Sequence, residues 1–369
     1  MKLVAFADLH LDTTFSWANR DVARTRRRNL RESLRRTVEL AHEVQADVLL
    51  CGGDLYEDAY VTPDTVSFLS DTFNECEMPV VLAPGNHDWL GPSSPYAQVN
   101  WESHVHLFQE PRLSPFVLEE GFTIWGGAHT RPAGTPGFFD SDFSASGDGV
   151  HIALFHGAEK GFFAFEHGYD SHKEPHAGFR ESQIHAAGLD YAFVGHYHHP
   201  RDSTHLTYPG NPDPLSFGEE SRRGAVVAEV GSDGTVAITR YDVAVSEVHD
   251  VSLDLTGSTS ANDVREAAAT AVDGLSGCIR LTLYGELAPE IDLRLEDFDG
   301  LSDEADQIVP RLGEITVAYD LEALAEDPTV RGQFVRTVTG DPTLDDDVRR
   351  RVIVTGLRAL DGRSDLGVE

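Results

Sequence analysis

Five short segments of the 369-residue chain combine carboxylates, imidazoles and an amide, and each segment lies at the end of an apolar run. The candidate side chains are, in chain order, Asp8, His10, Asp54, Asn86, His156, His196 and His198. Carboxylate and amide oxygens together with imidazole nitrogens form the ligand set of a mixed site for Mn, Fe, Co or Zn. One cation does not need seven ligands, so the pattern predicts two divalent metal ions.

The same residues suggest a phosphodiester hydrolysis. An aspartate can bridge two cations roughly 3.5 to 4 Å apart, the spacing of two-metal phosphoester sites, and Asp54 is the predicted bridge. His87 follows Asn86 directly, and we expect it to protonate the leaving oxygen or to hydrogen-bond the transition state. Asp88 would orient the His87 ring and fix its tautomer. The predicted reaction is in-line attack by a water that two cations activate.

The choice among the histidines depends on strand direction. His151 and His156 lie at opposite ends of one apolar run, about 17 Å apart at 3.3 Å per residue. In an open α/β sheet, ligands bind outside the carboxyl ends of the strands, which favours His156. His129, in the segment "WGGAHT", stays an alternative ligand. We expect the other histidines to be solvated or core residues.

The elements that must position these side chains alternate along the first 245 residues. Strands are predicted at 2–7, 46–53, 78–85, 122–128, 151–157, 190–196 and 223–230. Helices are predicted at 27–44 and 62–76, and the second begins with Thr62 and has Pro63 at its first helical position. This alternation indicates a layered α/β architecture.

The pattern changes near residue 246. Apolar runs at 248–255 and 278–287 surround a predicted helix at 260–272, and the end of the chain predicts further helices. We therefore expect three parts: a catalytic domain over 1–245, a small α/β capping module over 246–310 and a helical C-terminal segment over 311–369.

The composition indicates a folded protein with an unusual charge. No apolar run approaches the ~18 residues that span a bilayer, and the first residues lack a signal-peptide pattern, so we expect no membrane association. Three widely spaced cysteines predict neither disulfides nor a zinc knuckle and fit a reducing cytoplasm. The 62 acidic and 29 basic residues give a formal charge of −33. Such a charge is typical of a salt-saturated cytoplasm, where screening removes self-repulsion; an ordinary acidic protein is the alternative.

One segment is basic, because residues 20–36 carry eight arginines. Arginine forks suit phosphates, so Arg26, Arg27 and Arg28 are predicted nucleic-acid contacts. A salt-bridged surface helix explains the arginines equally well. Three aromatic residues near the predicted metal site could stack on bases, or could equally be core residues: Tyr56, Trp89 and Tyr197.

The segments "DLH", "GD", "GNHD", "HG" and "GHYH", in this order, resemble the calcineurin-like metallophosphoesterases. The longer segments "ADLHLD", "CGGDLYED", "PGNHD" and "YPGNPDPLSFGEE" are similar to the DNA-repair exonuclease branch, which includes SbcD, the nuclease subunit of the MRN complex and YhaO-like proteins. The resemblance implies an α/β fold of the metallophosphoesterase type: a β-sandwich flanked by helices, with a small α/β capping module and a helical C-terminus. With the acidic composition, it suggests a halophilic archaeon as the source.

By motif position, the resemblance implies two ligand sets, Asp8, His10, Asp54 and His198 for one metal and Asp54, Asn86, His156 and His196 for the other, and it implies that His87 is the catalytic histidine. Mn²⁺ is the expected ion, with Fe, Co or Zn as alternatives. The resemblance also implies an exonuclease or endonuclease of DNA double-strand-break repair, a homodimer and an SMC-like ATPase partner of the MRN or YhaN type. The chain departs from the family pattern at Glu57, where many relatives have Asp, and near Asn211 and Pro212, where they have Ser or Thr.

Two other functions stay open. The same metal centre would serve a phosphoesterase that acts on a nucleotide, a cyclic dinucleotide or a phosphoprotein. A scaffold that recruits an ATPase without catalysis is the second, although the intact ligand set argues against it. The additional C-terminal module favours a macromolecular substrate.

Overall fold

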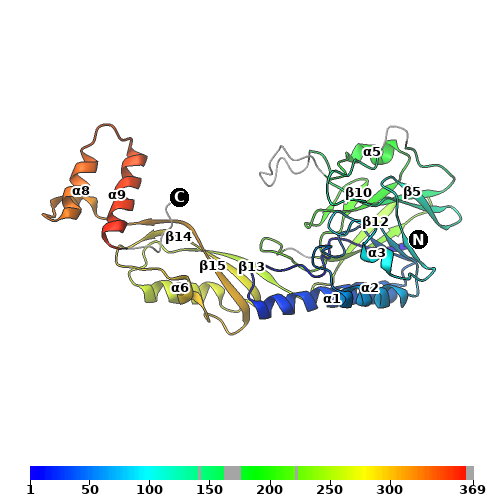
Figure 1. Cartoon of the computed structure of the whole chain (residues 1–369), viewed down its shortest axis with the longest axis horizontal. Coiled ribbons are helices and arrows are strands. Elements are labelled where there is room, and N and C mark those ends of the chain that lie inside the picture. The colour runs from blue at the N-terminus through cyan, green and yellow to red at the C-terminus, as the bar shows by residue number, and fades with distance from the viewer. Residues whose placement is uncertain (140–142, 162–175, 221–222, 363–369) are drawn as a thin grey trace. The chain divides into compact units, whose positions relative to one another are not determined.

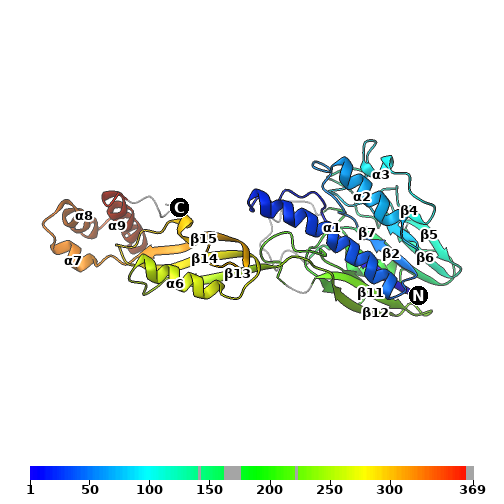
Figure 2. The ribbon, with the colours of Figure 1, turned by 90° about the horizontal axis from the view of Figure 1, so that it is seen from below.

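The computed structural model describes residues 1–139, 143–161, 176–220 and 223–362. The chain forms two compact units, Met1–Glu247 and Val248–Glu369. Figures 1 and 2 show the ribbon from two directions, and each unit is described by itself below.

Two six-stranded sheets form the first unit. The first has the order β12-β11-β1-β2-β3-β4, with the strands β1 (Lys2–Phe6), β2 (Val48–Cys51), β3 (Val80–Leu82), β4 (Val105–Leu107), β11 (Gly224–Val230) and β12 (Val236–Asp242). The second has the order β5-β6-β7-β8-β10-β9, with the strands β5 (Ser114–Glu119), β6 (Phe122–Gly126), β7 (Val150–His156), β8 (Tyr191–Gly195), β9 (Arg201–Asp202) and β10 (Leu206–Tyr208). Strands β1 to β4 are parallel, as are β6 to β8, so their carboxyl ends lie together in each sheet.

The two sheets pack face to face. Alternate side chains of a strand point to opposite faces of its sheet, so each strand contributes to a core on either side. Leu3 of β1 and Ile152 of β7 share the core between the sheets. Phe6 points to the helix-covered side of the first sheet, and Phe155 belongs to a third core on the outer face of the second. The predicted β-sandwich is therefore confirmed.

The helices of the first unit are α1 (Arg20–Glu43), α2 (Pro63–Asn74), α3 (Pro95–Gln98) and α5 (Glu181–Ala186). Helices α1 and α2 lie side by side along the first sheet (Figures 1 and 2). Helix α2 begins as predicted, with the Thr62 side chain accepting a hydrogen bond from the Thr65 N–H and Pro63 in the first turn. Leu30 and Leu34 of α1 are fully buried against the sheet, so the apolar stripe of this arginine-rich helix anchors it.

The second unit begins with a parallel sheet of order β13-β14-β15. Its elements are β13 (Val248–Asp254), α6 (Ala261–Val272), β14 (Gly277–Leu287), the 3₁₀ turn η1 (Leu295–Phe298), β15 (Ala305–Val317), α7 (Leu321–Glu326), α8 (Val330–Thr339) and α9 (Asp346–Leu360). Helix α6 packs on the sheet through Val264, Ala268 and Val272.

The prediction of a helical segment from residue 311 is wrong at its start, because residues 311–317 continue strand β15. The strand includes Pro310. This proline is tolerated because β15 is an edge strand, where a missing backbone donor can face solvent.

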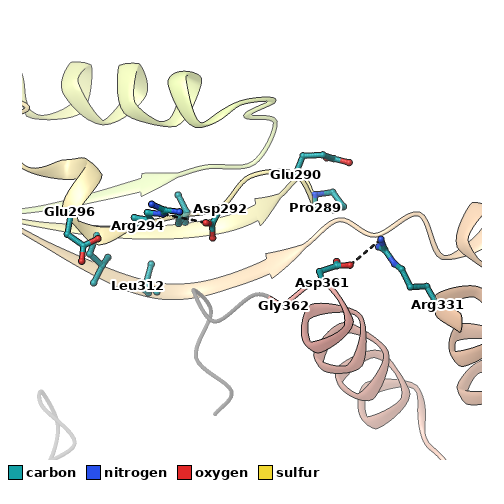
Figure 3. Close-up of a pocket in the computed structure, with 11 residues that line it drawn as sticks. Pro289, Glu290, Asp292, Arg294, Glu296, Leu312, Arg331, Asp361 and Gly362 are labelled. Carbon is teal, nitrogen blue, oxygen red and sulfur yellow. Dashed lines mark ion pairs between the residues drawn. The ribbon is translucent and has the colours of Figure 1, made fainter.

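The second unit also contains an open cavity of about 880 Å³ (Figure 3). Its two arginines are already paired: Arg331 with Asp361 at 3.1 Å and Arg294 with Asp292 at 3.5 Å. An anionic ligand would have to displace these carboxylates. Among the described residues, no helix has both the length and the apolar content needed to cross a bilayer.

Candidate metal centre and active site

The carboxyl ends of the parallel strands bring the predicted ligands to one edge of the sandwich. Asp8 follows β1, Asp54 follows β2, Asn86 follows β3, His156 ends β7, and His196 follows β8. Potential ligand atoms lie within 4.8 Å of one another in three groups, which are Asp8, His10 and His198; Asp8, Asp54 and His156; and His10, Asp54 and His87. Residues from five separate strands therefore form one cluster.

The backbone of this cluster adopts unusual conformations. Asp8, His10, Asp54 and His196 have φ angles of +57°, +50°, +52° and +117°, a region that side-chain-bearing residues rarely adopt. Such conformations cost about 1–3 kcal/mol each and persist at sites where the surroundings impose them. Gly85 permits the close approach of the loops, because a Cβ there would lie 2.3 Å from Asp54 Oδ1.

Asp54 lies at the centre of the cluster. Its Oδ2 is 3.2 Å from His156 Nε2 and 3.6 Å from His10 Nε2, and its Oδ1 accepts a hydrogen bond from the His87 N–H at 2.8 Å. Burial raises the pKa of Asp54, but the nearby imidazoles, His156 first, outweigh it and hold this pKa well below its usual range. A carboxylate shared by two cations needs such a central position.

Three histidines of the cluster have an oxygen partner at Nδ1. The pairs are His10 with Glu57 Oε1 at 2.8 Å, His156 with the Gly52 carbonyl at 3.0 Å and His198 with Glu219 Oε1 at 3.1 Å. A carbonyl or carboxylate oxygen only accepts, so each Nδ1 carries the proton and each Nε2 keeps its lone pair for the cluster. Metal-ligating histidines almost always have such a partner.

Several polar atoms of the cluster lack a partner, and a bound cation would be that partner. His10 Nε2 and Asn86 Oδ1 are buried and have no hydrogen-bond partner within the described part of the chain, which costs about 1–3 kcal/mol per group. His196 Nδ1 lies 3.3 Å from His156 Nε2. Burial is the main reason that the pKa of His196 lies well below its usual value, so its imidazole is neutral. The residues therefore fit divalent metal ions.

His87 lies at the exposed side of the cluster. Its side chain is 45% exposed, and its Nδ1 lies 2.8 Å from Glu57 Oε2. This hydrogen bond is the main reason that the pKa of His87 rises to about 9, so the imidazole holds a proton near neutral pH. Burial raises the pKa of Glu57, but hydrogen bonds from His10 and His87 outweigh it and bring it to about 2.

The prediction that Asp88 orients His87 is wrong. Asp88 is fully buried, and its carboxylate accepts hydrogen bonds from the backbone N–H groups of Gly85, Asp54 and Leu55 and from the Tyr96 hydroxyl. Consecutive side chains of this turn point in different directions, so Asp88 fastens the turn to its surroundings while Glu57 holds His87.

Replacing Asp88 with alanine is expected to destabilise the fold by about 3 kcal/mol or more. The substitution leaves four buried donors without an acceptor, at about 1–3 kcal/mol for each group that stays unsatisfied. Urea unfolding of the metal-free protein measures this. Asp71→Ala, on the exposed face of α2, is the control and should change stability by less than about 0.5 kcal/mol; equal effects would contradict the assigned role of Asp88.

The alternative ligand His129 belongs to the core behind the cluster. Its Nε2 donates to the backbone carbonyl of His156 at 2.8 Å, and it is absent from the three groups of potential ligand atoms among the described residues. His151 accepts a hydrogen bond from Trp125 Nε1 at the other end of β7.

The structure places three of the six predicted nucleic-acid contacts in the interior. Arg26 is 1% exposed, donates to the Pro214 carbonyl and lies 3.8 Å from Asp213. Tyr56 and Tyr197 are also buried. These three predictions are wrong. Arg28 is exposed, and Arg27 and Trp89 are partly exposed.

Two residues of the site were missed from sequence. Glu57 was noted only as a departure from a family pattern, and Glu219 occurs only within the quoted segment "YPGNPDPLSFGEE". Both carboxylates hold a histidine of the cluster. The only sequence signal for these two residues was the presence of an acidic residue near a motif. This signal is weak, because the chain has 62 acidic residues.

The β-sandwich and its edge of carboxylates, imidazoles and an amide define a metal-binding phosphoester hydrolase. The family model for calcineurin-like phosphoesterases matches residues 1–200, and the chain belongs to this family.

The chain is similar to two curated proteins. It is 25% identical over 381 residues to the uncharacterized metallophosphoesterase YhaO of Bacillus subtilis, across 95% of this chain and 83% of YhaO. It is also 25% identical over 268 residues to the DNA double-strand break repair protein Mre11 of Methanopyrus kandleri, across 64% of this chain and 55% of Mre11. The match thus spans about half of that Mre11. Among solved structures, TT1561 of Thermus thermophilus matches with a TM-score of 0.38 and 14% identity, across 65% of this chain and 98% of TT1561.

Proposed function

We propose that this phosphoesterase is a two-metal nuclease that cleaves DNA in double-strand-break repair. The observation that carries the metal chemistry is the cluster of Asp8, His10, Asp54, His156 and His198, with His196 beside His156 and with two buried unpartnered atoms, His10 Nε2 and Asn86 Oδ1. The similarity to an Mre11 supports DNA as the substrate.

We assign the ligands as the motifs imply, with Asp8, His10 and His198 at one position, Asn86, His156 and His196 at the other, and Asp54 shared by both. The group of Asp8, His10 and His198 and the approach of both Asp54 and His196 to His156 support this assignment. Two divalent cations, with Mn²⁺ as our expected ion, would lower the pKa of water and neutralise phosphoryl charge.

The protein's own groups would do the rest. The protonated His87 imidazole, half-exposed and held at Nδ1 by Glu57, would donate a proton from Nε2 to the leaving oxygen of the phosphodiester. The Asp54 carboxylate accepts a hydrogen bond from the His87 backbone N–H. This bond fixes the proposed acid, His87, beside the proposed bridging ligand, Asp54.

The direct test is incubation with end-labelled duplex and hairpin DNA and Mn²⁺, beside a small chromogenic phosphodiester. Cleavage of DNA together with the small diester supports the proposal. Hydrolysis of nucleotides, cyclic dinucleotides or a phosphoprotein without DNA cleavage would favour the alternative phosphoesterase, and no turnover with metal bound would favour the scaffold.

The partners and location belong to the same proposal. If the chain acts in double-strand break repair, as the name of the Mre11 relative states for that protein, we expect a homodimer and an SMC-like ATPase partner. We expect the protein to act in the cytoplasm. Sedimentation of the isolated chain, and co-purification with the ATPase, would test the two assemblies separately.

Helix α1 offers part of a DNA-binding surface. Arg24, Arg31 and Arg35 form ion pairs with carboxylates, as the salt-bridged alternative expects. Arg27 and Arg28 instead donate to the Thr14 carbonyl and the Thr25 hydroxyl, so their positive charges stay available for phosphates.

Changing Arg27 and Arg28 together to glutamate is therefore expected to weaken DNA binding without altering hydrolysis of the small diester. The slope of log affinity against log salt should fall by about 1 for each phosphate that the variant no longer binds. Arg35→Glu, at an exposed arginine of the same helix that is paired with Glu32, is the control. Unchanged DNA affinity in the double variant would leave only the salt-bridged explanation. Arg26 is excluded from this test because its burial would confuse binding with folding.

We also propose that the chain is adapted to high salt, since its formal charge is −33. At 0.01 M salt the charges act over about 30 Å, whereas at 1 M they act over about 3 Å. The thermal midpoint and the nuclease rate should both rise between 0.1 and 3 M KCl at constant Mn²⁺. Maximum stability and rate at 0.1 M would contradict this adaptation.

A further inference from the structure

The segment "YPGNPDPLSFGEE", residues 208–220, contains Glu219, the oxygen partner of His198 Nδ1. This segment, here called the 208–220 loop, begins at the end of β10 and packs beside His198, the second histidine of the "GHYH" motif. Asn211 and Asp213 of this loop are fully buried, and Glu219 is 5% exposed. Three polar side chains buried in one loop need hydrogen-bond partners. One of these partners is His198 of the candidate metal centre.

The two oxygens of the Glu219 carboxylate have different partners. Oε1 lies 3.1 Å from His198 Nδ1 and also accepts a longer hydrogen bond from the Ser216 hydroxyl at 3.4 Å. Oε2 accepts hydrogen bonds from Asn211 Nδ2 and from the Leu215 N–H, both at 2.7 Å. The loop therefore fixes the carboxylate mainly through Oε2, and Oε1 faces His198.

Arg223, the residue before β11, completes the arrangement. Its Nη1 donates to the His198 carbonyl at 2.8 Å and also to Asn211 Oδ1. Asn211 thus donates to Glu219 and accepts from Arg223, which leaves its amide one orientation. The backbone of His198 and its ring are held by the same set of buried groups.

We propose that Glu219, fixed by Asn211 and Arg223, is a positioning residue that sets the tautomer and ring orientation of His198. The inference deepens the proposed function and rests on it, because it assigns His198 to one of the two cation positions. An Nδ1–H that donates to Glu219 leaves the Nε2 lone pair for the group formed with Asp8 and His10.

The isosteric change Glu219→Gln distinguishes this role from simple packing. Asn211 and Leu215 donate to one oxygen of Glu219, so the glutamine carbonyl has to take that side. Its NH₂ group then faces His198 Nδ1, which must accept. The proton of the neutral ring moves to Nε2, and the ligand lone pair is lost although size and shape are unchanged.

The experiment is calorimetric titration of metal-free protein with Mn²⁺, together with long-range ¹H–¹⁵N spectra of histidine-labelled protein. His198 is assigned in these spectra through His198→Gln. For Glu219→Gln we expect one of the two binding events to weaken by about 10–100-fold, the usual effect of losing such a partner. We also expect the His198 proton to move from Nδ1 to Nε2. Excess Mn²⁺ should restore most of the rate on the small diester.

Two matched variants complete the test. Glu229→Gln, an exposed glutamate on β11, should leave both binding events unchanged. Glu219→Asp keeps two acceptor oxygens and should recover the His198 tautomer and part of the affinity; it also carries the test if the glutamine variant does not fold. Wild-type affinity at both sites, or an unchanged tautomer, in Glu219→Gln would overturn the proposal. Wild-type protein that binds no Mn²⁺ would refute the proposed function instead, while the metal-free spectra would still report on Glu219.

Discussion

Replacing Asp54 with alanine is expected to remove both cations and to lower hydrolysis of the small phosphodiester by at least about 10³-fold. The Asp54 carboxylate lies beside His156 and His10, and Asp54 belongs to two of the three described groups of ligand atoms. Two cations supply several kcal/mol of transition-state stabilisation, and each 1.4 kcal/mol is about tenfold in rate. Elemental analysis of the purified variant measures its metal content, and a rate assay measures the second effect.

A second substitution separates the metal from the loop. Asp54→Asn keeps an oxygen that can accept the His87 N–H, which the aspartate accepts at 2.8 Å, but it lacks the negative charge that two cations share. We expect it to lose metal almost as completely as the alanine variant while retaining the wild-type thermal midpoint without metal. An alanine variant with two ions per chain would disprove the bridging role.

Replacing His87 with alanine is expected to lower the rate by about 10²–10⁴-fold, the usual contribution of general acid catalysis, while two ions per chain remain bound. The reason is the position of the ring, which is 45% exposed and hydrogen-bonded to Glu57. His87 also belongs to one group of potential ligand atoms, with His10 and Asp54, so the metal content must be measured beside the rate.

The outcome distinguishes an acid from a ligand. A His87→Ala protein that loses one ion would show that His87 is a metal ligand. Full metal content together with a large loss of rate supports the role of His87 as the general acid. A smaller loss of rate on a substrate whose leaving group needs no proton also supports this role. His42→Ala, an exposed histidine at the end of α1, is the control and should match the wild type in rate and metal content.

The sequence predicted the layered α/β architecture because its strands are short apolar runs separated by amphipathic helices, whereas the β-sandwich was implied by the family resemblance. It also predicted which residues meet, because parallel strands place their carboxyl ends at one edge. Strand direction separated His156 from His151 without any structure. These inferences succeed because they depend on periodicity and chain direction, which are local properties of a sequence.

The partners of the side chains could not be predicted in the same way. His87 and Asp88 are neighbours in the chain, yet Asp88 is buried against Tyr96 and His87 faces Glu57. The conformation of a tight turn decides where each side chain points, and that conformation depends on groups brought in from other loops.

The sequence by itself determined the edge where chemistry takes place and the types of group present there. Only the tertiary structure decided which polar side chains are accessible. Arg26 is in an arginine-rich helix but is buried beside Asp213, and Glu219 holds His198 from a distant loop. The physical reason is that burying a charge is costly unless a partner is present, and both partners come from segments remote in the sequence.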